Sequence, residues 1–169
     1  MTELRQIASG LMFPEGPVAM PDGSVLLVEI RRGTLSRVTA HGRVEVVADL
    51  GGGPNGAAIG PDGRCYVCNN GGFEWHDYGG VFVPGEQAAD YSGGRIEAVD
   101  LATGKKLAAH PGHNTASLTF SKSGKRLQAL DGLSSALRVW DWNDSGRLGQ
   151  PVTLVKSAGM SAVELESHD

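Results

Sequence analysis

The sequence has few cysteines, no basic cluster and no long apolar run, and each absence excludes a class of protein. The 169 residues carry a net charge of −4, and no stretch concentrates Lys or Arg, so nucleic-acid binding has no electrostatic basis. A membrane helix needs roughly 20 consecutive apolar residues, and the apolar runs here are far shorter. The start, Met1–Arg5, lacks an apolar signal core. We expect a cytoplasmic protein without nucleic-acid or membrane partners.

The only two cysteines, Cys65 and Cys68, form a CxxC motif. A structural zinc site needs a second pair of ligands at similar spacing, which the sequence lacks. A thioredoxin-type site places the pair at the start of a helix, whereas this segment is typical of a strand. On a strand, positions i and i+3 face opposite sides. We therefore expect two small apolar residues in a strand rather than a metal or redox site.

Glycine is abundant, with 25 residues that mostly form short clusters between apolar runs. This pattern predicts many turns and an all-β fold of short strands. Three segments share one pattern of a short strand and a tight turn that ends in glycine: Phe13–Gly23, Pro54–Gly63 and Thr115–Gly124. A second strand follows each of them. The predicted third and fourth strands of these units are Thr34–Ala40 with Val44–Leu50, Arg95–Leu101 with Lys106–His110, and Leu137–Asn143 with Pro151–Val155.

Four antiparallel strands in a unit of roughly 40 residues are typical of a β-propeller blade. We predict an all-β, partial β-propeller with three blades at residues 11–53, 54–114 and 115–155, followed by a tail at 156–169. The alternative is an antiparallel sandwich. Closed propellers usually have 4–8 blades, so two chains forming a ring of six as a homodimer, an open fragment, and a sequence lacking further blades all remain open.

The repeat also identifies candidate site residues. The first strand of each propeller blade lines the central channel, and the residues eight positions before the first-turn glycines are Glu15, Asn55 and Ala116. Carboxylate and amide oxygens are suitable ligands for a hard cation such as Ca²⁺. We therefore predict metal ligation by Glu15 and Asn55. A second set of polar residues, Glu29, Asn69 and Asp131, ends the second strands and is expected to support the site or to meet the turns.

An insertion at Gly71–Ser92 interrupts the second unit. Loops this long in a compact domain are usually functional or disordered, and the aromatic residues of this one argue against disorder. We predict a lid over the channel mouth, with Asn70, Trp75, His76 and Tyr78 as pocket residues. The alternative is a loop packed on a neighbouring blade or chain.

Several motifs in order resemble the senescence-marker-protein, gluconolactonase and regucalcin family. They are Phe-Pro-Glu-Gly-Pro at 13–17, the glycine-rich run at 52–63, Cys-Asn-Asn-Gly-Gly-Phe-Glu-Trp at 68–75, and the run at 93–104. The resemblance implies a six-bladed propeller that holds one divalent metal, often Ca²⁺ and alternatively Zn²⁺, Mg²⁺ or Mn²⁺. It also implies hydrolysis of lactones, with the family's first-blade Glu matching Glu15.

The third unit departs from the family pattern. Ala116 stands where a later blade of the family supplies a ligand, and Asp131 is the only acidic candidate left in this unit for a general base. Two hypotheses follow. The chain is a metal-dependent hydrolase of a lactone or sugar-acid derivative, or it is an inactive propeller remnant that serves as a binding or assembly module.

Overall fold

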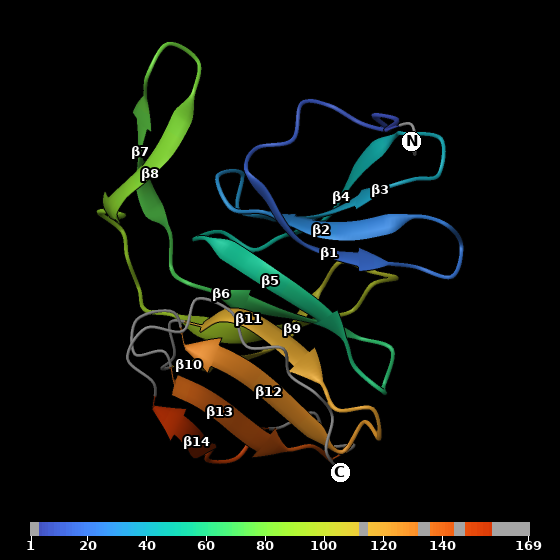
Figure 1. The fold of residues 1–169 in the computed structure, drawn as a ribbon, viewed down its shortest axis with the longest axis vertical. Coiled ribbons are helices and arrows are strands. Elements are labelled where there is room, and N and C mark those ends of the chain that lie inside the picture. Colours follow the sequence, from blue (N-terminus) through green and yellow to red (C-terminus); the bar gives the residue numbers. More distant parts are fainter. Residues whose placement is uncertain (1–3, 112–114, 132–135, 144–147, 157–169) are drawn as a thin grey trace.

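The computed structural model describes residues 4–111, 115–131, 136–143 and 148–156. All regular structure in these ranges is β-strand. Three four-stranded antiparallel sheets follow one another along the chain, and the hairpin β7–β8 projects from the second of them (Figure 1). The fold is therefore a partial β-propeller of three blades, as the sequence predicts.

The strands of each blade are consecutive in the sheet except where the hairpin is inserted. The first blade has the order β1 (Pro14–Ala19), β2 (Val25–Glu29), β3 (Thr34–Val38) and β4 (Val44–Asp49). The second has the order β5 (Pro54–Ile59), β6 (Cys65–Asn69), β9 (Arg95–Val99) and β10 (Lys106–Pro111). The third has the order β11 (Thr115–Phe120), β12 (Arg126–Asp131), β13 (Ala136–Asp141) and β14 (Val152–Lys156).

The insertion differs from the sequence-based expectation. Where a loop is expected at Gly71–Ser92, the structure forms the antiparallel hairpin of β7 (Phe73–Asp77) and β8 (Phe82–Gln87). Each four-stranded sheet lies within one predicted unit, apart from the last residue of β14. The predicted tail beyond Lys156 lies outside the described residues.

The three first turns of the blades have the same geometry. Their glycines, Gly23, Gly63 and Gly124, have φ values of 77°, 76° and 73°, in the left-handed region that glycine adopts without strain. The carboxylate of Asp22 accepts a hydrogen bond from the Ser24 amide at 3.0 Å, and that of Asp62 accepts one from the Arg64 amide at 3.1 Å. This local chemistry fixes the turns of the first two blades and hence the pairing of the first two strands in each of them.

The core lies between the blades. One apolar cluster joins the first two blades through residues such as Val28, Leu35 and Cys65, and another joins the second and third through Cys68, Ile96 and Trp140. Cys65 and Cys68 thus face opposite sides of β6, as their spacing predicts, and both are free and buried. Burial raises the pKa of each thiol to about 12.

The two buried thiols should therefore resist alkylation. At about pH 8 the thiolate is the reactive form, and a pKa of about 12 leaves almost none of either cysteine in that form. Mass spectrometry should detect no iodoacetamide adduct on the native protein and adducts at both Cys65 and Cys68 after denaturation. Rapid modification of one cysteine in the native protein would contradict the burial described here.

The innermost strands of the three blades approach one another closely at two glycines. A Cβ atom at Gly16 on β1 would lie 2.7 Å from the Cα atom of Gly56 on β5. A Cβ atom at Gly56 would in turn lie 3.3 Å from the carbonyl oxygen of Ala116 on β11. The absence of side chains at these two positions allows β1 and β11 to flank β5, and it places the starts of the three strands side by side.

Candidate metal and substrate site on the inner strands

The candidate residues gather at one end of the blades. At this end each first strand begins and each second strand ends, as the pairs Pro14–Glu29, Pro54–Asn69 and Thr115–Asp131 show. The hairpin β7–β8 leaves the second blade from the same end, because it follows Asn69 and Asn70. We call it the insertion end. The tight turns that contain Gly23, Gly63 and Gly124 lie at the opposite end.

Glu15, Asn55 and Ala116 lie on neighbouring inner strands. Glu15 and Asn55 each come one residue before a glycine of the close contacts just described, and Ala116 takes part in one of these contacts through its carbonyl oxygen. Irregular pairing marks all three positions. Asn55 lies in a register shift between Pro54 and Gly56, and Ala116 lies in the same shift on β11. Glu15 borders the corresponding irregularity of β1. β-Bulges redirect side chains and are frequent near active sites, and this feature was not predicted from the sequence.

The side chains at these positions offer oxygen donors but few of them. Glu15 is exposed and Asn55 is half-buried, while Ala116 has no donor. No group of three or more His, Cys, Asp or Glu side chains that could hold a metal occurs in the described part of the chain. Ca²⁺ takes 6–8 oxygen ligands. The donor chemistry therefore fits a hard cation, and most of its ligands would come from water, backbone or a second molecule.

The second polar set is buried and forms interstrand pairs. Ser36 donates to Glu29 at 2.6 Å, Asn69 donates to Glu97 at 3.0 Å, and Arg138 donates to Asp131 at 3.2 Å. In each pair, the residue that ends the second strand contacts the third residue of the third strand. The partners Ser36, Glu97 and Arg138 were not identified from sequence, although all three are polar residues at equivalent positions of the repeat.

Asp131 lies on β12, the second strand of its blade, rather than on an inner strand. Its side chain is buried and ion-paired with Arg138. This arrangement matches a strand-end polar residue that stabilises the blade. Its role as general base stays a prediction.

The hairpin contacts the first blade through aromatic rings. Phe13, just before β1, has a φ of 59°, a strained value for a residue with a side chain. Its ring lies 5.1 Å from that of Trp75 on β7. The guanidinium carbon of Arg31 lies 3.2 Å from the ring centroid of Phe82 on β8. These contacts hold the hairpin beside the start of β1, two residues from Glu15.

The four predicted pocket residues do not form one cluster. Asn70 is buried at the base of the hairpin, where its Oδ1 accepts the Gly72 amide at 2.9 Å. His76 follows Trp75 on β7 and therefore faces the other side of the hairpin, where its ring contacts Gly85. Tyr78, at the hairpin turn, is 69% exposed. Of the four, Asn70 lies at the base of the hairpin and Trp75 lies against the first blade.

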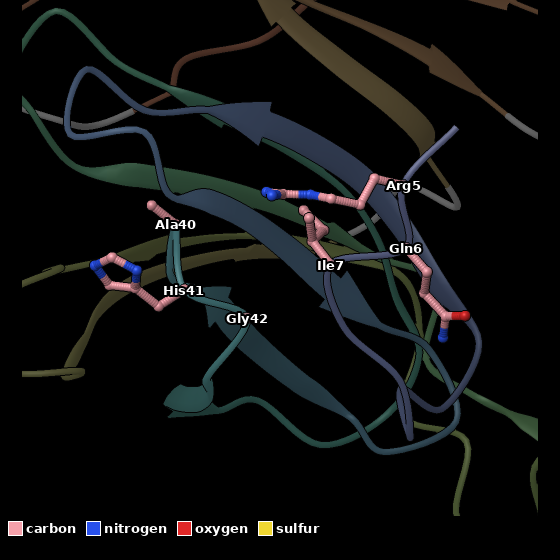
Figure 2. Close-up of a pocket in the computed structure, with 6 residues that line it drawn as sticks. All are labelled: Arg5, Gln6, Ile7, Ala40, His41 and Gly42. Atoms are coloured by element: carbon pink, nitrogen blue, oxygen red, sulfur yellow. The ribbon is translucent and has the colours of Figure 1, made fainter. Parts of the chain in front are cut away.

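A pocket of about 370 Å³ lies elsewhere, between the N-terminal segment and the β3–β4 turn (Figure 2). The residues that line it are Arg5, Gln6, Ile7, Ala40, His41 and Gly42. The β3–β4 turn is at the end of the first blade opposite to Glu15. This pocket is therefore separate from the candidate site.

Comparison with known sequences finds a family match over part of the chain. The sequence profile described as SMP-30/Gluconolactonase/LRE-like region matches residues 13–87. The family resemblance is confirmed over this segment. It extends from just before β1 to the end of β8, and it includes Glu15, Asn55 and Trp75. No curated protein sequence matches the chain.

Solved structures similar to the chain show the same fold. Kuenenia stuttgartiensis hydrazine synthase aligns over 92% of this chain and 40% of its own, with 18% identity and a TM-score of 0.62. The PQQ-bound aldose sugar dehydrogenase of Streptomyces coelicolor aligns over 82% and 47%, with 20% identity and a TM-score of 0.56. A streptogramin B lyase aligns over 79% and 38%, with 13% identity and a TM-score of 0.54. The chain thus spans less than half the length of each.

Among the described residues, no helix is long and apolar enough to cross a membrane.

Proposed function

We propose that the SMP-30/gluconolactonase-like segment binds a divalent cation, Ca²⁺ foremost, through Glu15 and Asn55, and that the protein hydrolyses lactones. The observation that carries this proposal is the placement of a carboxylate and an amide at the irregular starts of two adjoining inner strands. The profile match over residues 13–87 supports the reaction class. The substrate is a small lactone or sugar-acid derivative.

Each residue has a distinct part in this proposal. A bound divalent cation supplies a Lewis acid for the lactone carbonyl and lowers the pKa of a coordinated water. Glu15, which is exposed on β1, provides the negative charge that holds the cation. Asn55 provides a neutral oxygen on β5. Trp75, held against Phe13 at 5.1 Å, provides an apolar wall beside the start of β1 that would limit water and contact the substrate ring.

The proposal is tested by calorimetric titration of metal-free protein with Ca²⁺ and Zn²⁺. Glu15→Gln removes the charge and keeps the length of the side chain, and we expect it to weaken Ca²⁺ binding at least about tenfold because charged ligands set affinity at such sites. Glu45→Gln is the matched control, since Glu45 lies on the outer strand β4 and pairs with Arg43. Equal affinity of Glu15→Gln and the wild type would exclude Glu15 as a ligand.

Activity is measured on the same proteins with a simple lactone, such as a gluconolactone. Hydrolysis should require the added cation, stop on chelation, and decline in Glu15→Gln in parallel with affinity. Full hydrolysis in the presence of a chelator would contradict a metal-dependent reaction.

We further propose that a second copy of the chain completes the ring of blades and supplies additional cation ligands. Sedimentation of the cation-loaded protein should then give the mass of two chains. A monomer that binds the cation and hydrolyses lactone would contradict this arrangement.

A further inference from the structure

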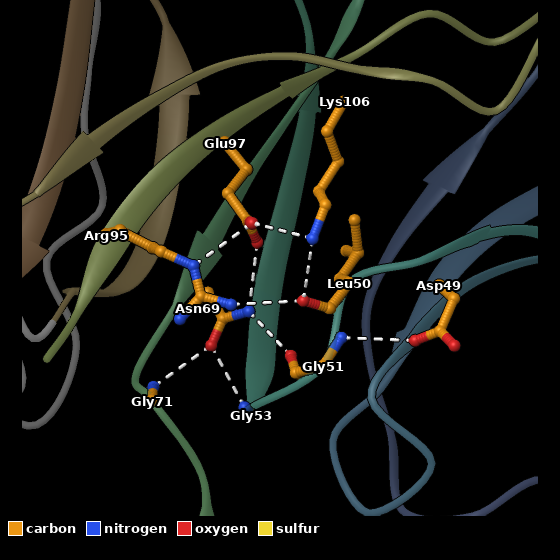
Figure 3. Close-up of polar contacts among 9 residues, drawn as sticks. All are labelled: Asp49, Leu50, Gly51, Gly53, Asn69, Gly71, Arg95, Glu97 and Lys106. Atoms are coloured by element: carbon orange, nitrogen blue, oxygen red, sulfur yellow. Dashed lines mark hydrogen bonds and ion pairs between the residues drawn. The ribbon is translucent and has the colours of Figure 1, made fainter. Parts of the chain in front are cut away.

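The Asn69 side chain connects two glycine-rich segments at the insertion end (Figure 3). Its Oδ1 accepts the amides of Gly53 and Gly71, each at 3.0 Å. Its Nδ2 donates to the Gly51 carbonyl at 2.8 Å and to Glu97 at 3.0 Å. Gly53 immediately precedes β5 and its Asn55 bulge, and Gly71 begins the base of the hairpin. One buried amide therefore contacts both structures.

The two segments are also packed directly against each other. A Cβ atom at Gly52 would lie 3.2 Å from the carbonyl carbon of Gly71, and one at Gly53 would lie 3.0 Å from the Cα atom of Gly72. The backbone N–H of Asn70 donates to the Gly53 carbonyl at 2.9 Å. Because backbone touches backbone here, movement of the hairpin base would displace the segment that leads into Asn55.

Asn69 is itself fixed by a buried charge network. Glu97 is 2% exposed and forms ion pairs with Arg95 at 3.0 Å and with Lys106 at 3.8 Å. The Arg95 and Lys106 side chains also donate to the Leu50 carbonyl, at 3.1 and 3.3 Å respectively. The network thus holds the connector between the first two blades through the carbonyl groups of Leu50 and Gly51. The second carboxylate oxygen of Glu97 accepts the hydrogen bond from Asn69.

Comparison with the first blade shows why the second blade has an amide at this position. In the first blade, the strand-end residue is Glu29, which accepts hydrogen bonds from Ser36 and from the Met12 amide. Asn69 faces both backbone donors and the Glu97 carboxylate, so its side chain must accept and donate at once. An amide satisfies both requirements, with one oxygen that accepts and two N–H groups that donate, whereas a carboxylate cannot donate and a hydroxyl has a single O–H.

We propose that Asn69 is a positioning residue that holds the Asn55 bulge and the base of the β7–β8 hairpin in a single arrangement. For the consequence on cation affinity, the inference rests on the proposed function of Asn55. In this arrangement the two sides of the proposed site, the cation ligand and the aromatic wall at Trp75, do not move independently.

Amide hydrogen exchange and Ca²⁺ titration of three variants test this role. Asn69→Ala removes all four hydrogen bonds, and Asn69→Asp keeps both acceptor contacts but places a carboxylate against Glu97. Asn69→Asp/Glu97→Gln exchanges the two chemical groups and restores a donor between them. We expect the Gly53 and Gly71 amides to exchange about tenfold faster or more in both single variants, since each loses part of a buried network. The Kd for Ca²⁺ should rise about tenfold, and the double variant should recover much of both losses.

Ser36→Ala is the matched control, because it removes an equivalent buried interstrand bond of the first blade, away from both glycine segments. It should leave the Gly53 and Gly71 amides unchanged. The inference is overturned if only one of these amides responds to Asn69→Ala, or if both respond while Ca²⁺ affinity stays at the wild-type value. Absence of Ca²⁺ binding by the wild type would refute the proposed function instead, and joint exchange of the two amides would then decide the positioning role alone. Asn69→Asp provides the exchange data if Asn69→Ala does not fold.

Discussion

Gly16→Ala should lower the free energy of unfolding by about 3 kcal/mol or more, because the added methyl group meets backbone rather than a movable side chain. The new Cβ atom would lie 2.7 Å from Gly56 Cα and 2.8 Å from the Ala57 nitrogen. Gly16 also has a φ of 55°, which disfavours any residue with a side chain. Urea unfolding followed by tryptophan fluorescence measures the loss.

Gly63→Ala separates the two causes of this loss. Gly63 has a φ of 76°, but an added Cβ atom would have no neighbour within 4 Å. The substitution therefore carries the backbone strain alone, for which we expect about 1–2 kcal/mol. Equal losses for Gly16→Ala and Gly63→Ala would mean that β1 and β5 do not approach as closely as described.

The same contact matters for the candidate site. Glu15 and Asn55 immediately precede Gly16 and Gly56, so a wider separation of β1 and β5 would also separate the two proposed ligands. A folded Gly16→Ala protein should bind Ca²⁺ more weakly than Gly63→Ala does. The repeat aligns Gly16 with Gly56 as it aligns Glu15 with Asn55, but the close approach of the two glycines is seen only in the structure.

The repeat made the blades and the inner-strand positions predictable from sequence. Pro-Asp-Gly turns at Gly23 and Gly63 leave little freedom in the pairing of the strands around them. The register beyond the turns was not predictable to one residue. The bulge at Asn55 adds a residue to only one strand, and the inner strands contain proline and small residues whose hydrophobic alternation is too weak to reveal such a shift.

The hairpin was missed because its local signals conflict. Pro84 lies within β8, and proline usually argues against a strand. The structure tolerates it because β8 pairs with β7 alone and is therefore an edge strand. The partners of the second polar set on the third strands were missed for another reason. Ser36 lies seven residues after Glu29, whereas the inserted hairpin places Glu97 28 residues after Asn69, so the equivalence becomes visible only in the sheet.

Tyr66→Ala should destabilise the protein by about 3–5 kcal/mol, the range for removing a large aromatic side chain from a core. Tyr66 is fully buried between the second and third blades. Its ring centroid lies 4.8 Å from that of Trp142 and 5.3 Å from that of Phe120, with interplanar angles of 83° and 70°. Loss of the ring removes this contact from the blade interface and leaves a cavity.

Two further substitutions assign the loss to the ring. Tyr66→Phe removes only the hydroxyl group, which donates to Asp62 at 2.8 Å, and should cost about 1–2 kcal/mol. Tyr78→Ala makes the same substitution at the exposed hairpin turn and should change stability by no more than about 0.5 kcal/mol. A cost of Tyr66→Ala close to that of Tyr66→Phe would show that the interface between the two blades is loosely packed.

Tryptophan fluorescence reports on the same interface without unfolding the protein, because two of the three tryptophans, Trp140 and Trp142, belong to the cluster around Tyr66. In Tyr66→Ala the emission should shift towards longer wavelength, because water enters beside the Trp142 ring, which is 9% exposed in the wild type. The Ca²⁺ affinity of that variant should change little, since Glu15 and Asn55 lie in the first two blades, which have their own cluster around Val28 and Cys65. A large loss of affinity would mean that the third blade, despite Ala116 at its inner position, contributes to the cation site.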